Sequence, residues 1–282
     1  MKRSIGEYVI VTAGLIIDGH DKIAAEVYFR HEADDEEQVR RMQLLYNDEY
    51  HATFSVDRLG LYHYRVRAWV DQFATWQDQF RRRVDGGDSK YEIENELKEG
   101  AAFLRSSAQA SADREARQKL GAYAELFERG DVEAALTADV LELARDNDPR
   151  DGAVESRTYD LQVDPELARF AAWYEYFPRS AGSADKQGAP VHATLDEAAE
   201  ILPRIKDLGF DVVYLPPVHP IGSTNRKGKD NAPEADLGEP GSPWAIGSNE
   251  GGHKAVHPDL GGMEAFDRYV ARAESLGLKV AL

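Results

Sequence analysis

The chain contains no cysteine among its 282 residues. It therefore has no disulfide framework, no thiolate ligand for a metal ion and no cysteine nucleophile. It also lacks any run of about 18 apolar residues, the length that predicts a membrane-spanning helix, so no membrane partner is expected. The first residues are basic, but Gly6-Glu7-Tyr8 stands where a signal peptide needs an apolar core. These absences predict a cytoplasmic protein.

The chain also has no excess of basic residues. The formal net charge is -17, from 51 acidic and 34 basic residues. Nucleic-acid phosphates are bound by Lys and Arg side chains that release counterions, so the composition argues against nucleic acid as a partner. The acidic excess itself is typical of a solvated surface that keeps a protein in solution.

The first 70 residues alternate between apolar and polar side chains with a period of two. The alternation is clear from Ile23 to Phe29 and from Tyr62 to Val70, and turn signals such as Asn47-Asp48 separate the segments. This pattern predicts short antiparallel strands that form part of a β-sandwich. The strands are too few to close a sandwich. A further alternating segment, Ser156 to Val163, is predicted to supply the missing strand.

Between about Gln72 and Asp148 the apolar period becomes helical. Apolar stripes run through three segments, and glycine pairs or Gly-Asp dipeptides separate them. The pattern predicts an antiparallel bundle of three or four helices joined by short loops, inserted into the β domain. The stripes indicate a bundle core rather than a cofactor pocket. The three segments run from Ile93 to Leu104, from Ala116 to Phe127 and from Val132 to Leu143.

After Ala168 the sequence predicts strands and helices in alternation. Buried strands are expected at Phe170 to Tyr176, at Phe210 to Leu215 and from Leu278 to the last residue. A parallel sheet with helices on both faces follows from this order. A Rossmann half and a TIM barrel both begin in this way. The absence of Gly-x-Gly-x-x-Gly after the first strand, and a long loop after a strand, favour the barrel.

The two helices between these strands have recognisable ends. Thr194 and Glu197 form a capping box, and Pro203 should kink the helix that follows near Ala199. In the second helix, Met263 to Ala273, the predicted buried face consists of Met263, Phe266, Val270 and Ala273.

The loop from Pro216 to His257 is the candidate functional site, because such long connections are uncommon in compact domains unless they bind something. His253 and His257 have a zinc-binding spacing for a helix, but the adjacent Gly251-Gly252 and Pro258 argue against a helix. No metal site and no cofactor are therefore predicted. The loop also lacks the Gly-Lys-Ser/Thr ending of a Walker phosphate loop.

Basic, amide and aromatic side chains gather in the same loop. The cluster from Arg226 to Lys229 could be a solvated turn, but Asn225, Asn231 and Trp244 accompany it. Lysine and amides supply hydrogen-bonding groups and the indole supplies an apolar face, a mixture that suits a sugar. For Trp244, packing inside the loop is the alternative interpretation.

The motifs GFDVVYLPPVHPIG, NRKGKDN and GSPWAIGSNEGGHKAVHPDLGG resemble the second-strand region of the α-amylase superfamily. Their closest likeness is to bacterial maltosyltransferases that use α-maltose 1-phosphate to extend α-1,4-glucans. The segment WYEYFPRS, which begins at Trp173, is similar to the first barrel strand of that family. The likeness is strong from about Ala168 onward and is one of architecture before it.

The resemblance implies a multidomain fold. An immunoglobulin-like β-sandwich would comprise residues 1–71 and 153–165, interrupted by the helical bundle at residues 72–152. Residues 166–282 would form the first two to three βα units of a (β/α)8 TIM barrel. The resemblance also implies a homodimer formed through the N-terminal domains.

The resemblance further assigns substrate-binding residues. Lys227, in the RKG motif, matches a lysine that contacts the non-reducing sugar of a bound maltosyl unit. Ser242, in GSPWAIGS, matches a position near the phosphate-bearing end of the substrate. Asn231, Trp244 and His253 lie in the same motifs and are further candidates. The implied partners are maltose 1-phosphate and an α-1,4-glucan acceptor.

The family's catalytic carboxylates follow later strands, so they are expected beyond Leu282 and no catalytic residue is assigned. The parent enzyme would transfer maltosyl units by a retaining double displacement, whereas these 282 residues alone are expected to be inactive. Two alternatives stay open. The chain could act as a dimerisation or interaction module, or belong to another glycoside hydrolase or transglycosylase of the superfamily.

Overall fold

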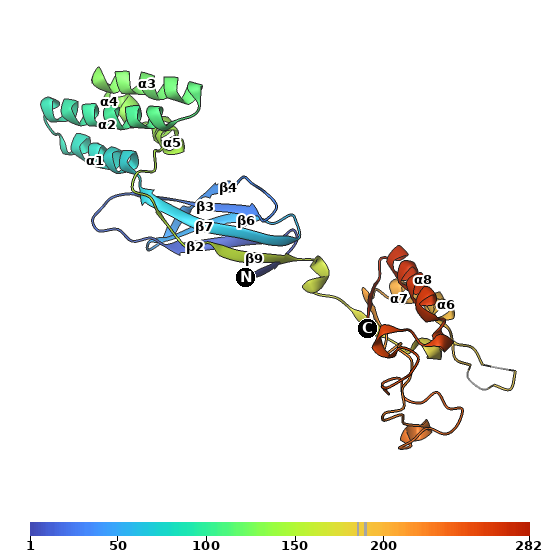
Figure 1. The fold of residues 1–282 in the computed structure, drawn as a ribbon. Coiled ribbons are helices and arrows are strands. Elements are labelled where there is room, and N and C mark those ends of the chain that lie inside the picture. The colour runs from blue at the N-terminus through green and yellow to red at the C-terminus, as the bar shows by residue number, and fades with distance from the viewer. Residues whose placement is uncertain (185, 189–190) are drawn as a thin grey trace. The chain divides into compact units, whose positions relative to one another are not determined.

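The computed structural model describes residues 1–184, 186–188 and 191–282, and the chain divides into two compact units. The first unit is Met1–Pro165 and the second is Glu166–Leu282. Figure 1 shows that the first unit contains a group of helices beside antiparallel strands, and that the second combines strands, helices and long loops. No helix within the described ranges has the length and apolarity that crossing a membrane requires.

The strands of the first unit form two sheets. The larger sheet has the order β1-β9-β7-β3-β4, with β8 paired to β7, and the smaller sheet has the order β2-β6-β5. All pairings are antiparallel except that of β1 with β9. The strand bounds are β1 Lys2–Ser4, β2 Tyr8–Gly14, β3 Ile23–His31, β4 Gln38–Arg41, β5 Gln43–Tyr46, β6 Glu49–Ser55, β7 Gly60–Val70, β8 Val154–Glu155 and β9 Tyr159–Asp164.

The inward side chains of the two sheets share one hydrophobic core. Phe29 on β3 stacks on Phe54 on β6, with their ring centroids 4.0 Å apart. The hairpin between β5 and β6 turns at Asn47 and Asp48, which have φ angles of 41° and 62°. Two consecutive positive φ angles match the right-handed twist of a hairpin, and Asn and Asp tolerate them best after glycine. The predicted turn at these residues is confirmed.

The chain returns to the larger sheet after the helices. β9 pairs with β7 in antiparallel register, with Leu161 opposite Tyr62. The strand predicted from Ser156 to Val163 is confirmed over most of its length, as β9. β8 joins the same strand, with Val154 opposite Ala68.

Five helices lie between β7 and β8, and they pack around a separate core (Figure 1). Trp76 is stacked between Phe80 and Phe127, at centroid distances of 5.1 and 5.6 Å. The predicted third helical segment is wrong as a single helix. It breaks at Leu136, because the Thr137 side chain accepts a hydrogen bond from Val140 N–H and starts a new helix. The helices are α1 Gln72–Gly86, α2 Lys90–Ala110, α3 Arg114–Glu128, α4 Val132–Ala135 and α5 Ala138–Asp146.

The second unit is built on a parallel sheet of three short strands in the order β10-β11-β12. The helix opened by the Thr194 capping box is interrupted at Ala199, as predicted from Pro203, and continues after a 3-10 turn. Asp196 binds Arg268 through two hydrogen bonds of 2.7 and 2.8 Å, which join α6 to α8. The bounds are β10 Trp173–Glu175, β11 Val212–Tyr214, β12 Lys279–Ala281, α6 Leu195–Ala198, α7 Leu202–Asp207 and α8 Gly262–Ser275.

Two burial predictions for this unit are wrong. Met263 is 52% exposed, whereas Ala273 is buried as predicted, and Ala265 and Tyr269 share the buried face of α8 with it. Tyr269 can be buried because its hydroxyl lies 2.8 Å from that of Tyr176, which in turn donates to the carbonyl of Ala198. Burial raises the pKa of Tyr176 to about 12, so both hydroxyls stay protonated and paired.

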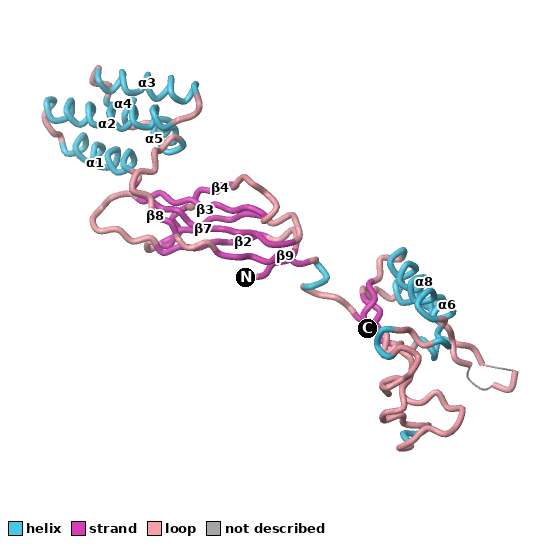
Figure 2. Tube along the Cα trace, viewed as in Figure 1, coloured by secondary structure: helices cyan, strands magenta, loops and turns pink. Residues whose placement is uncertain are grey.

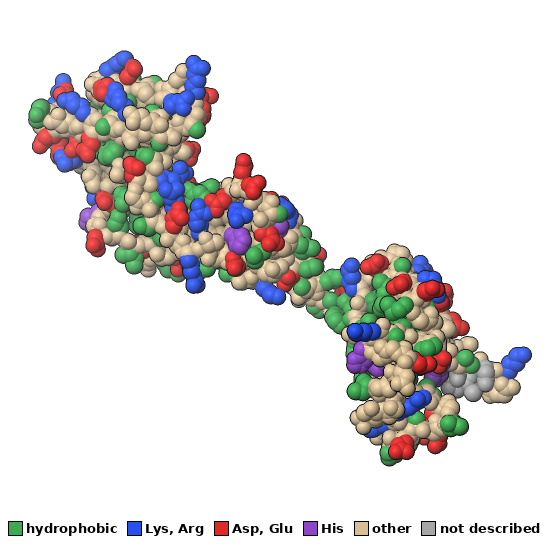
Figure 3. Space-filling view, viewed as in Figure 1, with side chains coloured by type: hydrophobic (Ala, Val, Ile, Leu, Met, Phe, Trp, Pro, Cys, Tyr) green, Lys and Arg blue, Asp and Glu red, His purple; other side chains and the backbone are tan. Residues whose placement is uncertain are grey.

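The predicted buried strand at Phe170 to Tyr176 is also shorter and more exposed than expected. Only Trp173–Glu175 is a strand, and Phe170 is 78% exposed. Figure 3 shows hydrophobic side chains at the surface of the second unit. β10 is an edge strand of the three-stranded sheet, so its apolar residues have fewer neighbours than the sequence pattern implies.

Candidate functional site

The loop that joins β11 to α8 lies at the C-terminal ends of the parallel strands, the edge where α/β folds bind ligands. Figure 2 shows this connection as an extended loop with a few short helical turns. It contains all five residues that the sequence analysis assigned to substrate binding.

Backbone hydrogen bonds close the central part of the loop. Gly222 N–H donates to Ala245 O and Thr224 N–H to Ile246 O, at 2.9 and 3.0 Å. A side chain at position 222 is excluded, because a Cβ there would lie 1.8 Å from the carbonyl oxygen of Ile246. Residues 222–246 therefore form a closed subloop whose ends are fixed to each other.

Within the subloop, a second set of bonds brings the RKG and GSPW motifs together. Ser242 N–H donates to Lys227 O at 3.0 Å, and the Arg226 guanidinium donates through Nη2 to Glu239 O at 2.9 Å. Gly241 has a φ of 74° and packs so closely on Arg226 that a Cβ would lie 2.4 Å from the arginine Cγ. The chain thus places Lys227 beside Ser242, although 15 positions separate them.

An open depression with a volume of about 610 Å³ lies beside this contact. Three of the predicted residues line it, Lys227, Asn231 and Ser242, together with His192 from an earlier segment of the chain. Its walls carry cationic, amide, hydroxyl and imidazole groups. The complete lining is His192, Lys227, Gly228, Lys229, Asn231, Glu239, Pro240, Gly241 and Ser242.

The polar groups of the depression are partly oriented by one another. Lys227 Nζ donates to Asn231 Oδ1 at 2.8 Å, which leaves the ammonium two further donors and the amide nitrogen free to donate. Asn231 has a φ of 65°, a left-handed conformation that asparagine tolerates better than most residues. Glu239 Oε2 accepts from the backbone N–H groups of Lys229 and Asp236, at 3.3 and 3.0 Å. The loop therefore presents mainly hydrogen-bond donors to a ligand.

Trp244 does not line this depression. It is 56% exposed, and its ring meets the Phe177 ring edge to face with centroids 5.6 Å apart. Phe177 lies outside the loop, and an indole that is more than half exposed is not the loop core that the alternative interpretation predicts. The exposed surface keeps an apolar face available to a ligand.

His253 lies beside a different depression, of about 580 Å³, which is lined largely by apolar residues. Its ring centroid is 4.6 Å from that of His219. In the described ranges, no group of three or more His, Asp or Glu side chains is arranged to hold a metal ion. The structure therefore separates His253 from Lys227, Asn231 and Ser242.

A buried cation lies at the end of β10, next to Phe177. Arg179 is 9% exposed, and its Nη2 has no hydrogen-bond partner within the described part of the chain. Burial lowers the pKa of Arg179, and burial together with the Arg179 charge lowers the pKa of His257. His257 is therefore neutral at pH 7, and its Nδ1 accepts a hydrogen bond from Asp259 N–H at 3.1 Å.

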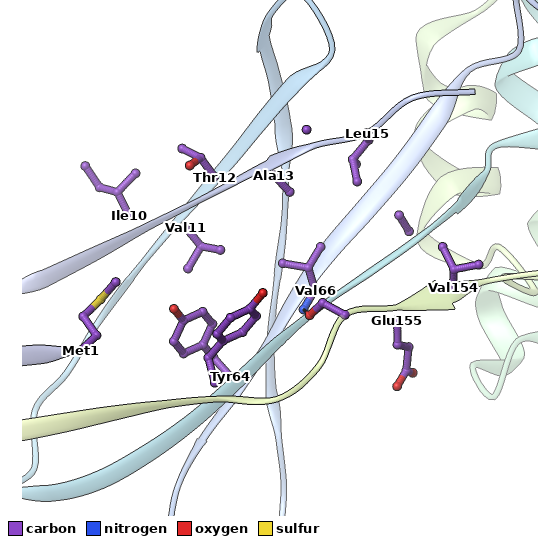
Figure 4. A pocket seen from close by; sticks show the side chains of 14 residues that line it. Met1, Ile10, Val11, Thr12, Ala13, Leu15, Tyr64, Val66, Val154 and Glu155 are labelled. Carbon is purple, nitrogen blue, oxygen red and sulfur yellow. Dashed lines mark hydrogen bonds between the residues drawn. The ribbon is translucent and has the colours of Figure 1, made fainter. Parts of the chain in front are cut away.

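The first unit has a cavity of its own, of about 550 Å³ (Figure 4). Aliphatic and aromatic side chains such as Val11, Tyr64 and Val66 surround it. None of the residues predicted to bind substrate lies there.

A family model described as Alpha-1,4-glucan:maltose-1-phosphate maltosyltransferase, domain N/S, matches residues 1–165. The chain belongs to this family. A maltosyltransferase of this name from Salinibacter ruber is 55% identical over 287 residues, which cover 100% of this chain and 42% of the relative. The one from Mycobacterium tuberculosis H37Rv is 41% identical over 309 residues, which cover 100% of this chain and 44% of the relative. The chain thus spans less than half the length of these two maltosyltransferases.

Solved structures similar to the chain include an α-amylase from Lactobacillus plantarum. It is 32% identical, and the match covers 40% of this chain and 22% of the amylase, with a TM-score of 0.29. A maltogenic α-amylase from Thermotoga neapolitana is 26% identical over 39% of this chain and 21% of its own, with a TM-score of 0.28.

The sequence pattern predicts the loop but not every residue of the depression. Lys227, Asn231 and Ser242 line one depression, and their role in binding stays a prediction. His192 and Glu239 were missed. His192 precedes the Thr194 capping box by two positions, and no motif connects it to a loop that begins more than 20 residues later.

Proposed function

We propose that this chain supplies part of the substrate-binding site of an α-1,4-glucan:maltose-1-phosphate maltosyltransferase. The complete enzyme would transfer maltosyl units from α-maltose 1-phosphate to the non-reducing end of an α-1,4-glucan in the cytoplasm, with retention of configuration. Family membership supports this proposal, and so does the name shared by the relatives.

The observation that carries the proposal is the joining of the RKG and GSPW motifs around one open depression. Lys227, Asn231 and Ser242 offer an ammonium, an amide and a hydroxyl within one site. Sugars carry several hydroxyls that both donate and accept hydrogen bonds, and sites of this polarity bind them. We propose Lys227, Asn231 and Ser242 as substrate-binding residues. Trp244 and His253 would act outside the depression, in contacts with other parts of the substrate.

We also propose the finer architecture that this function implies. The two sheets of residues 1–71 and 153–165 would form an immunoglobulin-like sandwich, with residues 72–152 as an inserted bundle. Residues 166–282 would form the first βα units of a (β/α)8 barrel. Support comes from the two-sheet core, the return of β9 to β7 and the three parallel strands.

The chain alone is expected to release no phosphate when incubated with maltose 1-phosphate and a maltooligosaccharide. A retaining transfer needs two carboxylates about 5 Å apart around the scissile bond. Glu239 is the single carboxylate among the residues that line the depression, and its Oε2 is held by two backbone N–H groups. A phosphate-release assay checks this. Turnover at ordinary enzyme rates would contradict the assignment of catalysis to residues outside this chain.

Dimer formation by the first unit is a second candidate function. Tyr8 and Ile10 project from the edge strand β2 and are 71% and 62% exposed. Exposed apolar side chains on an unpaired edge favour association with another surface. We expect residues 1–165 to be dimeric by light scattering, and substitution of both residues by Thr to shift the species toward monomer. A monomer of residues 1–165 at micromolar concentration would count against this function.

A further inference from the structure

The depression beside Lys227 has a wall that comes from a separate segment of the chain. We propose that His192 is a sugar-contacting residue, so that the binding site is assembled from residues 191–194 as well as residues 227–242. The proposal rests on the proposed function, because it takes the ligand to be a glucosyl unit of a maltosyl donor or an α-glucan. It adds a contact that neither the motifs nor the family resemblance assigns.

The backbone on both sides of His192 is fixed. Val191 N–H donates to Ser183 O at 2.9 Å, and Ala193 N–H donates to Arg179 O at 3.0 Å. Ala193 is 1% exposed, whereas His192 is exposed. The neighbours of His192 are therefore held against Arg179 and Ser183, in and just after the 3-10 turn Pro178–Ala181, while its own side chain lines the depression.

Gly182 makes this attachment possible. A Cβ at position 182 would lie 1.9 Å from the carbonyl oxygen of Val191, so the two backbones approach more closely than any side chain allows. On the other side, Thr194 and Glu197 form the reciprocal capping box that starts α6. His192 thus stands between two segments whose backbones are fixed by hydrogen bonds, and it lines the depression together with residues of the loop.

The imidazole supplies a hydrogen-bond acceptor, a group that is scarce among the side chains of the loop. The side chains from residues 227–242 offer mainly donors, because one Glu239 oxygen is occupied by backbone N–H groups and Asn231 Oδ1 by Lys227. A neutral histidine has one donor and one acceptor nitrogen, and its ring adds a flat surface for the C–H face of a pyranose. A sugar hydroxyl held by Lys227 could then donate its own proton across the depression.

Chemical modification of the wild-type chain provides the first test. Diethyl pyrocarbonate carbethoxylates exposed histidines, and mass spectrometry locates the modified residues. We expect maltose to slow the modification of His192 several-fold, and to leave that of His20, an exposed histidine of the first unit, unchanged. Equal rates with and without saturating maltose at His192 would overturn the inference.

Calorimetric titration with maltose separates this inference from the proposed function. His192→Ala is expected to weaken binding about three- to tenfold, the effect of losing one or two neutral hydrogen bonds, and His192→Gln to recover part of the loss. His20→Ala is the matched control. Wild-type chain that is folded by circular dichroism but does not bind maltose contradicts the proposed function. Saturable binding that His192→Ala leaves unchanged contradicts only the role of His192.

Discussion

Replacing Lys227 with alanine is expected to weaken maltose binding about 10- to 100-fold, because hydrogen bonds from a charged group are worth about 1.5–3 kcal/mol. Among the described residues, the Lys227 ammonium has one partner, Asn231 Oδ1 at 2.8 Å, and therefore two donors to offer a sugar. Calorimetric titration of the wild type and the variant with maltose measures the change. The side chain is exposed, so the thermal unfolding temperature should stay the same.

A matched control for this substitution is Lys206→Ala, which removes an exposed lysine of α7 in the same unit. It should bind maltose as the wild type does. If Lys227→Ala and Lys206→Ala are indistinguishable from the wild type, the depression is not the sugar site. Lys227→Arg is a sharper probe, because a guanidinium keeps the charge but presents a planar fork in place of three rotatable donors.

The second large effect is expected at the junction between the helices and the larger sheet. Asp71 is 2% exposed, caps α1 through a hydrogen bond from Ala74 N–H at 2.9 Å, and accepts from Arg145 Nε at 3.1 Å. Asp71→Ala should lower the free energy of unfolding by about 2–3 kcal/mol, since it removes a helix cap and one partner of a partly buried ion pair. The expected loss of unfolding free energy is smaller than for a fully buried ion pair, because the Arg145 side chain is partly exposed to solvent.

Urea unfolding followed by circular dichroism measures this loss. Asp113→Ala is the control, because Asp113 is an exposed residue that caps α3 through a hydrogen bond from Glu115 N–H. It should cost about 1 kcal/mol, the usual value for a cap alone. Equal losses for the two substitutions would mean that the pair with Arg145 contributes nothing. A double-mutant cycle with Arg145→Ala would then give a coupling energy near zero.

Much of the fold follows from local sequence pattern. Alternation predicts β3, β7 and β9, and the Thr194 capping box followed by Pro203 predicts both the start and the interruption of a helix. The errors have physical causes that lie outside local pattern. Thr137 starts a new helix inside an apolar stripe, and Tyr269 is buried because Tyr176 satisfies its hydroxyl.

The candidate site was predictable to the extent that it lies in one stretch of sequence. Lys227 and Ser242 belong to neighbouring motifs, and a loop that closes on itself brings them together. His192 could not be found in this way, because its place depends on hydrogen bonds to Arg179 and Ser183 that no residue pattern announces. Trp244 and His253 show the converse, since sharing a motif with Ser242 does not place them in the same depression.

The two ends of the helical segment meet on a single strand. Val154 on β8 pairs with Ala68 on β7, so the chain leaves the sheet and re-enters it at almost the same point. For protein engineering, we predict that residues 72–152 can be replaced as a block. Another domain with adjacent termini, or a short turn, could connect β7 to β8 and leave the strand order unaltered. Such a replacement would remove Arg145 and would therefore have to supply a new partner for Asp71 at the end of β7.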